Sequence, residues 1–315
     1  MAAAIPPRIR RGQTLGVVAP AGPVRPDRLR AGLDRLGDAF RIRLAPSLEP
    51  GAVRDPQVPS YLAASDEVRV AELEAMLADP DVRAIVLARG GYGLMRILAH
   101  LDPALLRADP KPIVGFSDAT ALLAWAHAAG VRAIHGPVIA QLADLPDEDV
   151  GHLVRLLTEP RALGVRPWPL TTHGSGTRRG PLVTANLTLA SMLVGTPWAL
   201  PLDGAIAVFE EVGERPYEID RYLTQLLLTG ELAKPSAVVI GDLTRCHDPS
   251  PPAGVPDPAE AALDTLLERL HAVGAPAATG APIGHGARNE AVPFGALSVL
   301  DLDRGTLEIT EPAVA

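Results

Sequence analysis

The sequence predicts an α/β protein with two domains: an N-terminal doubly wound, mostly parallel sheet and a smaller C-terminal α/β domain. A chain of 315 residues is long enough to form two hydrophobic cores. The first half alternates apolar, β-branched runs with amphipathic stretches. A segment rich in Pro, Gly and Thr follows, without a clear period. We therefore expect domains at 1–160 and 182–315, joined by a linker at 161–181.

The N-terminal domain is expected to alternate strands and helices. The strands are predicted at 14–21, 41–46, 82–90, 111–116 and 131–138. The helices are predicted at 25–40, 65–80, 94–101 and 119–130, with Ser65 as the N-cap of the second. Strands separated by such helices pair in parallel through right-handed crossovers. Ligands of these sheets bind beyond the carboxyl ends of the strands.

After a helix at 147–159, the C-terminal half mixes both element types. We predict helices at 186–195, 218–230 and about 259–273, and strands at 204–211, 236–243, 294–302 and 306–310. The last two strands are expected to pair antiparallel.

Composition excludes several classes of function. The net charge is −8 and no Lys/Arg-rich block is present, which argues against a nucleic-acid partner. The single cysteine, Cys246, cannot form an intrachain disulfide, and no Cys/His cluster has zinc-site spacing, so we expect no metal and a reducing cytoplasm. No apolar run reaches eighteen residues, and the N-terminus does not resemble a secretory signal, so no membrane span is expected. Neither a Walker loop nor a GxGxxG motif follows a strand, and we expect no cofactor.

The segment KPIVGFSDATAL places Ser117 between a predicted strand and a predicted helix. This is the arrangement of a nucleophile elbow, in which a sharp turn exposes the hydroxyl beside helix N–H groups. The pattern is Gly115-x-Ser117-x-Ala119, so the second glycine of the usual motif is missing. The simpler alternative is a serine that caps the helix.

A second group, ARGGYG at residues 88–93, has two adjacent glycines at a predicted strand end. Exposed N–H groups there could stabilise an oxyanion. The alternative is an ordinary glycine turn with Tyr92 as a packing residue.

A third group combines Glu210, at the end of an apolar strand, with His285, which lies between two glycines. A nucleophilic serine needs a base, and the base needs an acceptor that fixes its tautomer. His135, at the end of the strand after Ser117, could line the same crevice. For the remaining six histidines, on predicted helices or loops, a surface or core role is the simpler interpretation.

Together these segments resemble the LD-carboxypeptidase family of serine peptidases, which includes the microcin C7 self-immunity proteins. The matching motifs are RGGYG, GFSDAT, EEVGERPYEIDR and PIGHG, in the family's order. The resemblance implies a catalytic triad of Ser117, Glu210 and His285. It also implies that the N-terminal domain carries the serine, that the C-terminal domain carries the acid and base, and that the active site lies at the interface.

The resemblance further implies an oxyanion hole formed by the N–H groups of Asp118 and Gly91. Arg89, Tyr92, Arg96 and Asn186 are the expected substrate-binding residues, with Arg96 or Arg89 holding a terminal carboxylate. One departure is that Thr184 and Ala185 replace paired glycines that many members have before Asn186.

The expected function is release of a terminal D-alanine from a murein tetrapeptide, in peptidoglycan recycling, by a cytoplasmic homodimer without a cofactor. One alternative is a self-immunity hydrolase of a peptidyl or aminoacyl-nucleotide antibiotic. Two others are an ordinary α/β-hydrolase esterase and a non-catalytic binder of peptidoglycan fragments. The motif Gly-Glu-x-Pro-Tyr at residues 213–217 favours the carboxypeptidase.

Overall fold

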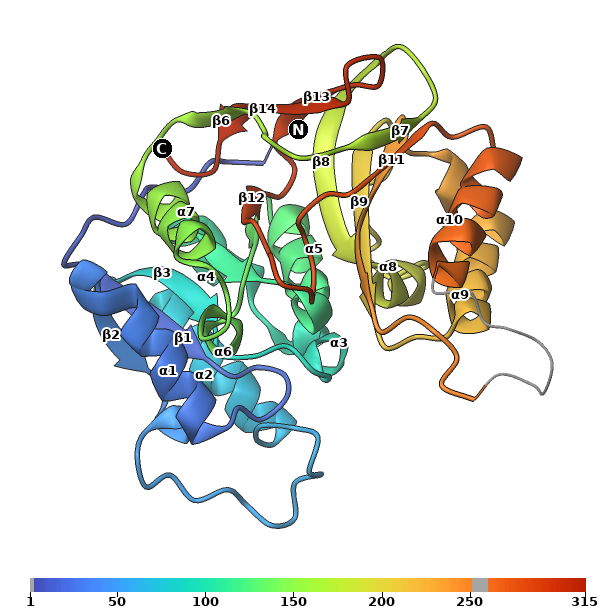
Figure 1. Cartoon of the computed structure of the whole chain (residues 1–315). Coiled ribbons are helices and arrows are strands. Elements are labelled where there is room, and N and C mark those ends of the chain that lie inside the picture. Colours follow the sequence, from blue (N-terminus) through green and yellow to red (C-terminus); the bar gives the residue numbers. More distant parts are fainter. Residues whose placement is uncertain (1–2, 251–259) are drawn as a thin grey trace. The chain divides into compact units, whose positions relative to one another are not determined.

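The computed structural model describes residues 3–250 and 260–315, which fold into two compact units (Figure 1). The first unit comprises Met1–Ala162, Glu290–Gly295 and Pro312–Ala315, and the second comprises Leu163–Asn289 and Ala296–Glu311. The predicted α/β class with two domains is confirmed. The division differs from the predicted one because two short C-terminal segments belong to the first unit.

The first unit is built on a six-stranded sheet in the order β12-β5-β4-β3-β1-β2. Its strands are β1 (Thr14–Val18), β2 (Arg41–Leu44), β3 (Val82–Leu87), β4 (Ile113–Gly115), β5 (Ile134–His135) and β12 (Val292–Pro293). Five strands are parallel, and β12 runs antiparallel to β5 at one edge. The chain order reverses between β1 and β3, and such a switch point is where α/β sheets bind ligands.

Two groups of helices cover this sheet. They are α1 (Pro26–Leu36), α2 (Asp66–Ala78), α3 (Leu94–Ile97), α4 (Pro103–Ala108), α5 (Thr120–Ala128), α6 (Ile139–Leu142) and α7 (Asp147–Thr158). Helix α1 packs against α6 and α7, whereas α2 contacts α3 and α4, and α3 contacts α5. Right-handed crossovers place these two groups on opposite faces, as a doubly wound sheet requires.

The second unit contains an eight-stranded sheet in the order β6-β14-β13-β8-β9-β10-β11-β7. Its elements are β6 (Ala162–Val165), β7 (Thr171–His173), β8 (Thr177–Asn186), α8 (Leu187–Met192), β9 (Ile206–Val212), α9 (Pro216–Leu228), β10 (Ala237–Thr244), α10 (Ala261–Ala272), β11 (Ala277–Thr279), β13 (Leu297–Asp301) and β14 (Thr306–Pro312). Strands β8 to β11 are parallel, and β13 and β14 form the predicted antiparallel pair. Helices α9 and α10 pack against each other (Figure 1).

The segment predicted as a linker, 161–181, contains β6, β7 and the start of β8, so it includes regular secondary structure. Strands β6 and β7 are the two edges of their sheet, and their residues are exposed or half-buried. Edge strands are short and polar and tolerate Pro and Gly, so their composition looks like that of a loop.

Most other predicted elements were correct in type but too long, whereas the strand predicted at 306–310 extends to Pro312. The strand predicted at 131–138 is only Ile134–His135, and the helix predicted at 25–40 ends at Leu36. Ser65 caps α2 as expected, accepting a hydrogen bond from the Val68 N–H at 3.3 Å. The predicted start of the helix near 259 lies outside the described residues. Among the helices that the structure describes, none is long and apolar enough to cross a membrane.

Candidate active site

Ser117 lies directly after β4 in a strained backbone conformation. Phe116 is extended, with φ −151° and ψ −176°, and Ser117 then adopts a φ of +64°. A non-glycine residue in the left-handed region costs on the order of 1–3 kcal/mol and is held there by its surroundings. Neither the 3₁₀ turn Ser117–Ala119 nor α5 has a side-chain cap, so the alternative that Ser117 caps the helix is wrong. The turn has the geometry of a nucleophile elbow.

The close packing of Gly115 and Ala119 explains the departure from the usual elbow motif. A Cβ added to Gly115 would lie 2.6 Å from the Cβ of Ala119, closer than real Cβ contacts. The glycine two residues before the serine is therefore required, and the alanine two residues after it fits because its partner has no side chain.

The loop Gly90–Gly93, here called the glycine loop, lies beside Ser117. A Cβ on Gly90 would come within 3.0 Å of the Ser117 Cβ and 3.3 Å of its Oγ. The Gly90 carbonyl accepts the Gly22 N–H at 3.0 Å, which ties the loop to the segment that follows β1 at the switch point. Gly91 has a φ of +103°, so this backbone path favours glycine. Its N–H and that of Asp118 remain the predicted oxyanion donors.

A fully buried arginine, Arg69 of α2, organises the loops at this edge of the sheet. Its guanidinium donates to the carbonyls of Pro20, Ala64 and Gly93 and pairs with Asp66. Because each carbonyl lies on a different segment, one side chain fixes three loops. The Gly93 end of the glycine loop is one of them.

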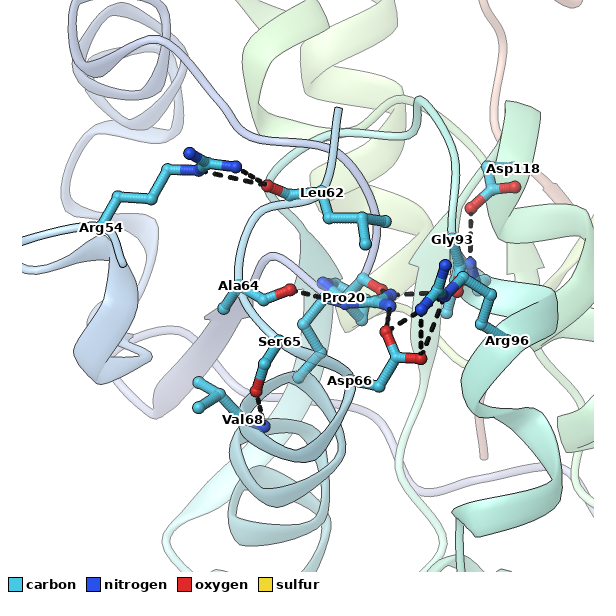
Figure 2. A network of polar contacts seen from close by, with 12 residues as sticks. Pro20, Arg54, Leu62, Ala64, Ser65, Asp66, Val68, Gly93, Arg96 and Asp118 are labelled. Atoms are coloured by element: carbon cyan, nitrogen blue, oxygen red, sulfur yellow. Dashed lines mark hydrogen bonds and ion pairs between the residues drawn. The ribbon is translucent and has the colours of Figure 1, made fainter. Parts of the chain in front are cut away.

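The two arginines predicted to bind a terminal carboxylate already have protein partners. Arg96 pairs with Asp66, with its Nε 3.0 Å and its Nη2 2.9 Å from Oδ2 (Figure 2). Burial acts to raise the pKa of Asp66, but the bonds from Arg96 and Arg69 outweigh it and lower the pKa. Arg89 donates from Nη1 to the Pro23 carbonyl at 2.8 Å. The substrate-binding role of both arginines stays a prediction.

Tyr92, the other predicted substrate-binding residue of this unit, is about half-exposed. Its ring packs edge-on against that of Tyr61, with centroids 5.6 Å apart. His135, by contrast, is completely buried.

In the second unit, the structure brings Glu210 and His285 together. Glu210 is on β9 with no exposed surface, and its Oε2 lies 2.6 Å from Nδ1 of His285. The loop that carries His285 follows β11. Gly284 has a φ of +135°, and a Cβ there would lie 3.0 Å from the same Oε2. A buried carboxylate against Nδ1 leaves Nε2 as the nitrogen that can accept a proton.

Asp242 is a residue of this site that sequence reasoning missed. It lies on β10, and its backbone N–H donates to the Ile283 carbonyl at 2.8 Å. Its carboxylate accepts the Gly286 N–H. Burial raises the pKa of Asp242, while the Gly286 N–H and the nearby His285 act against that rise. The signals in the sequence were an acid at the end of an apolar strand and glycines on both sides of His285.

Asn186 has a structural role within its unit. Its Oδ1 caps α8 by accepting the Leu189 N–H at 3.2 Å, and its Nδ2 donates to Glu211 at 2.8 Å. Glu211 also accepts bonds from the N–H and hydroxyl of Thr188, and burial raises its pKa. The substrate-binding role of Asn186 stays a prediction.

The residues that replace the paired glycines, Thr184 and Ala185, are fully buried within β8. They pair in register with Val208 and Phe209 of β9. The substitution therefore changes the strand that neighbours Glu210.

Comparison with known proteins supports one family. Residues 15–136 match the LD-carboxypeptidase N-terminal domain, and residues 179–300 match the C-terminal domain of the same family. A putative carboxypeptidase of Streptomyces coelicolor is 37% identical over 98% of this chain and 97% of its own. The probable murein peptide carboxypeptidase of Bacillus subtilis is 32% identical, covering 96% and 93%. The murein tetrapeptide carboxypeptidase of Pseudomonas aeruginosa is 35% identical, covering 78% and 80%.

Solved structures agree with the fold. The muramoyltetrapeptide carboxypeptidase of Oxalobacter formigenes superposes with a TM-score of 0.81 at 26% identity, over 95% of this chain and 99% of that one. The microcin C7 self-immunity protein MccF gives a TM-score of 0.85 at 20% identity, over 99% and 100%. At that identity, the second likeness shows the fold alone.

Proposed function

Since this chain belongs to the LD-carboxypeptidase family, we propose that it releases the terminal D-alanine from a murein tetrapeptide through an acyl-enzyme. The observation that carries the proposal is the 2.6 Å bond between the buried Glu210 and Nδ1 of His285. Such a pair is what a serine hydrolase needs to hold its base in one tautomer.

In the proposed mechanism, Nε2 of His285 takes the proton from Oγ of Ser117 as this oxygen attacks the scissile carbonyl. The tetrahedral intermediate collapses, His285 gives the proton to the leaving amine, and D-alanine departs. Water then attacks the acyl-enzyme with the same base, which restores the serine and frees the shortened peptide. Glu210 stabilises the imidazolium form of His285 in both halves.

The N–H groups of Asp118 and Gly91 are the proposed donors to the oxyanion of the tetrahedral intermediate. One donor of this kind is worth roughly 2.7–4 kcal/mol in other hydrolases. The positive φ of Ser117 and the glycine loop beside it support this assignment.

The names of the relatives support a murein peptide as substrate, because those proteins of Bacillus and Pseudomonas are described as murein carboxypeptidases. The motif Gly-Glu-x-Pro-Tyr at residues 213–217 supports the same substrate. Glu214 within it accepts the Tyr222 hydroxyl at 2.9 Å. Hydrolysis of an aminoacyl-nucleotide antibiotic remains the competing activity to test.

We further propose that the enzyme acts in the cytoplasm as a homodimer. The single cysteine fits a reducing compartment. Light scattering of the purified protein measures the oligomeric state, and fractionation of cells tests the location.

The deciding experiment is mass spectrometry of the protein incubated with murein tetrapeptide, tripeptide and an aminoacyl-sulfamoyl nucleoside. Loss of one alanine from the tetrapeptide alone is expected. Ser117→Ala should reduce turnover by several orders of magnitude while the protein stays folded. Cleavage of the nucleoside conjugate without tetrapeptide turnover would favour the competing activity, and an active Ser117→Ala variant would reject the mechanism.

A further inference from the structure

The side chain of Asp118 connects the turn that carries Ser117 to the glycine loop (Figure 2). Its Oδ2 accepts the N–H of Leu94 at 2.9 Å, and Leu94 directly follows the last glycine of the loop. Asp118 is only 3% exposed, so water competes little for this bond. The residue thus follows the serine in the chain and holds the end of the loop.

We propose that the carboxylate of Asp118 is a positioning group, which holds the glycine loop so that the Gly91 and Asp118 N–H groups converge on one oxyanion. This inference rests on the proposed function, since it assigns a role within that mechanism. The backbone of Asp118 is a predicted donor, and its side chain sets the place of the second donor.

The glycine loop needs such support because its backbone has unusual freedom. Gly91 and Gly93 adopt φ values of +103° and +127°, and glycine loses more conformational entropy on ordering than other residues. An oxyanion donor must lie within about 2.7–3.1 Å of the developing charge, and misplacement by about 1 Å can cost 10²-fold in rate. External hydrogen bonds must therefore fix the loop.

The other bonds to the loop tie it to different parts of the unit. Gly22 holds the carbonyl of Gly90, and Arg69 holds the carbonyl of Gly93 at 3.0 Å. These contacts hold the loop against the segment that follows β1 and against α2. The bond from Leu94 to Asp118 differs because it ties the loop to the residue next to Ser117. The bond therefore fixes the position of the Gly91 N–H relative to the Ser117 hydroxyl.

Burying the charged carboxylate of Asp118 costs free energy, which argues that its hydrogen bond from the Leu94 N–H has a role. Burial raises the pKa of the carboxyl to about 6, against the effects of the Leu94 N–H and Arg69, so the group is ionised at neutral pH at an energetic cost. A hydrogen bond from an N–H to a carboxylate is shorter and stronger than one between neutral groups. The charge therefore strengthens the contact that fixes the loop.

The test compares Asp118→Ala with Asp118→Asn in steady-state hydrolysis of the tetrapeptide. The alanine variant should lower kcat about 100-fold, with KM changed less than about threefold, because only transition-state binding is weakened. The asparagine variant keeps an oxygen that accepts from Leu94 and should recover kcat to within about tenfold of wild type. A kcat of Asp118→Ala within twofold of wild type would overturn the inference.

Asp102→Ala is the matched control. Asp102 also accepts a backbone N–H, from Ala104 at 2.8 Å, but it caps α4 and is exposed. This variant should lose about 1 kcal/mol of stability and keep its kcat. If it lost kcat as Asp118→Ala does, loss of stability would explain both results, and the inference would be wrong.

A readout without substrate separates this inference from the proposed function. Amide hydrogen exchange at Leu94 should be at least tenfold faster in Asp118→Ala than in wild type, and unchanged in Asp102→Ala. Loss of kcat without faster exchange at Leu94 would show that the loop is held by other contacts, against the inference. An active Ser117→Ala enzyme would instead refute the proposed function, whatever the exchange at Leu94.

Discussion

A Cβ atom added to Gly286 would lie 1.8 Å from Oδ2 of Asp242, so this carboxylate fills the space that any larger residue would need. The glycine directly follows His285 and donates its N–H to the same carboxylate. Asp242 thereby fixes the loop that carries the proposed base, while Glu210 fixes the ring itself.

Gly286→Ala should therefore displace His285 and lower kcat/KM at least about 100-fold, since shifts of about 1 Å are that costly. Gly151→Ala in α7 is the control, because a Cβ there meets only the flexible Nη1 of Arg155, at 3.3 Å. It should raise stability by about 0.5–1 kcal/mol and leave kcat/KM unchanged. Equal kinetics in the two variants would contradict the assigned role of the Asp242–Gly286 contact.

Glu210→Gln should lower kcat by about 10³–10⁴-fold, because a neutral amide no longer fixes the tautomer or stabilises the imidazolium of His285. KM for the tetrapeptide should change little, and circular dichroism should report an intact fold. Glu308→Gln on the exposed face of β14 is a control for loss of one negative charge. A Glu210→Gln enzyme within tenfold of wild type would remove Glu210 from the mechanism.

Asp118 should make stability depend on pH. Burial raises the pKa of its carboxyl in the folded protein from the usual 3.8 to about 6, so its contribution to stability is fully present below pH 3.8 and is lost as pH rises through about 6. The difference is at most about 3 kcal/mol. Urea unfolding across this range should show a weaker loss of stability in Asp118→Asn than in wild type. Identical pH profiles would show that the carboxyl titrates normally.

Lys111 should stabilise the C-terminus of α2. Its buried Nζ donates to the carbonyls of Met76, Leu77 and Asp79, at 3.2, 2.6 and 2.6 Å. Lys111→Met leaves these acceptors without that donor and should cost about 1–3 kcal/mol in the free energy of unfolding.

The matched control for Lys111 is Lys234→Met, which removes a partly exposed ammonium paired with Glu231. Its effect should stay within about 0.5 kcal/mol. Urea denaturation measures both, and equal losses would show that burial of Lys111 has no special value.

The sequence predicted the elements well where the hydrophobic periodicity and the order of the segments along the chain both indicate the same structure. The alternation of buried strands with helices predicted the parallel sheet. The change from a strand pattern to a helix pattern between β4 and α5 predicted the place of Ser117. Glu210 was visible as the first of two acids at the end of an apolar strand, and the structure gives it a histidine partner.

Features that depend on contacts between residues far apart in the chain could not be predicted from the sequence. Strand β12 has only two residues, Val292 and Pro293, and exists because it pairs with β5, far away in the chain. Arg96 stood at a suitable spacing for a substrate carboxylate, but no local pattern shows that Asp66 binds it. The same applies to Asp242, whose importance depends on the loop folded against it.

The chain crosses between the two units after residues 162, 289, 295 and 311. During synthesis, the edge of β5 therefore stays unpaired until β12 has left the ribosome, although the segment that carries Ser117 emerges well before it. A fragment that contains Ser117 but not β12 would leave the edge of β5 open to pairing with other molecules. The N-terminal and C-terminal parts are therefore poorly suited to separate expression or to exchange between homologues.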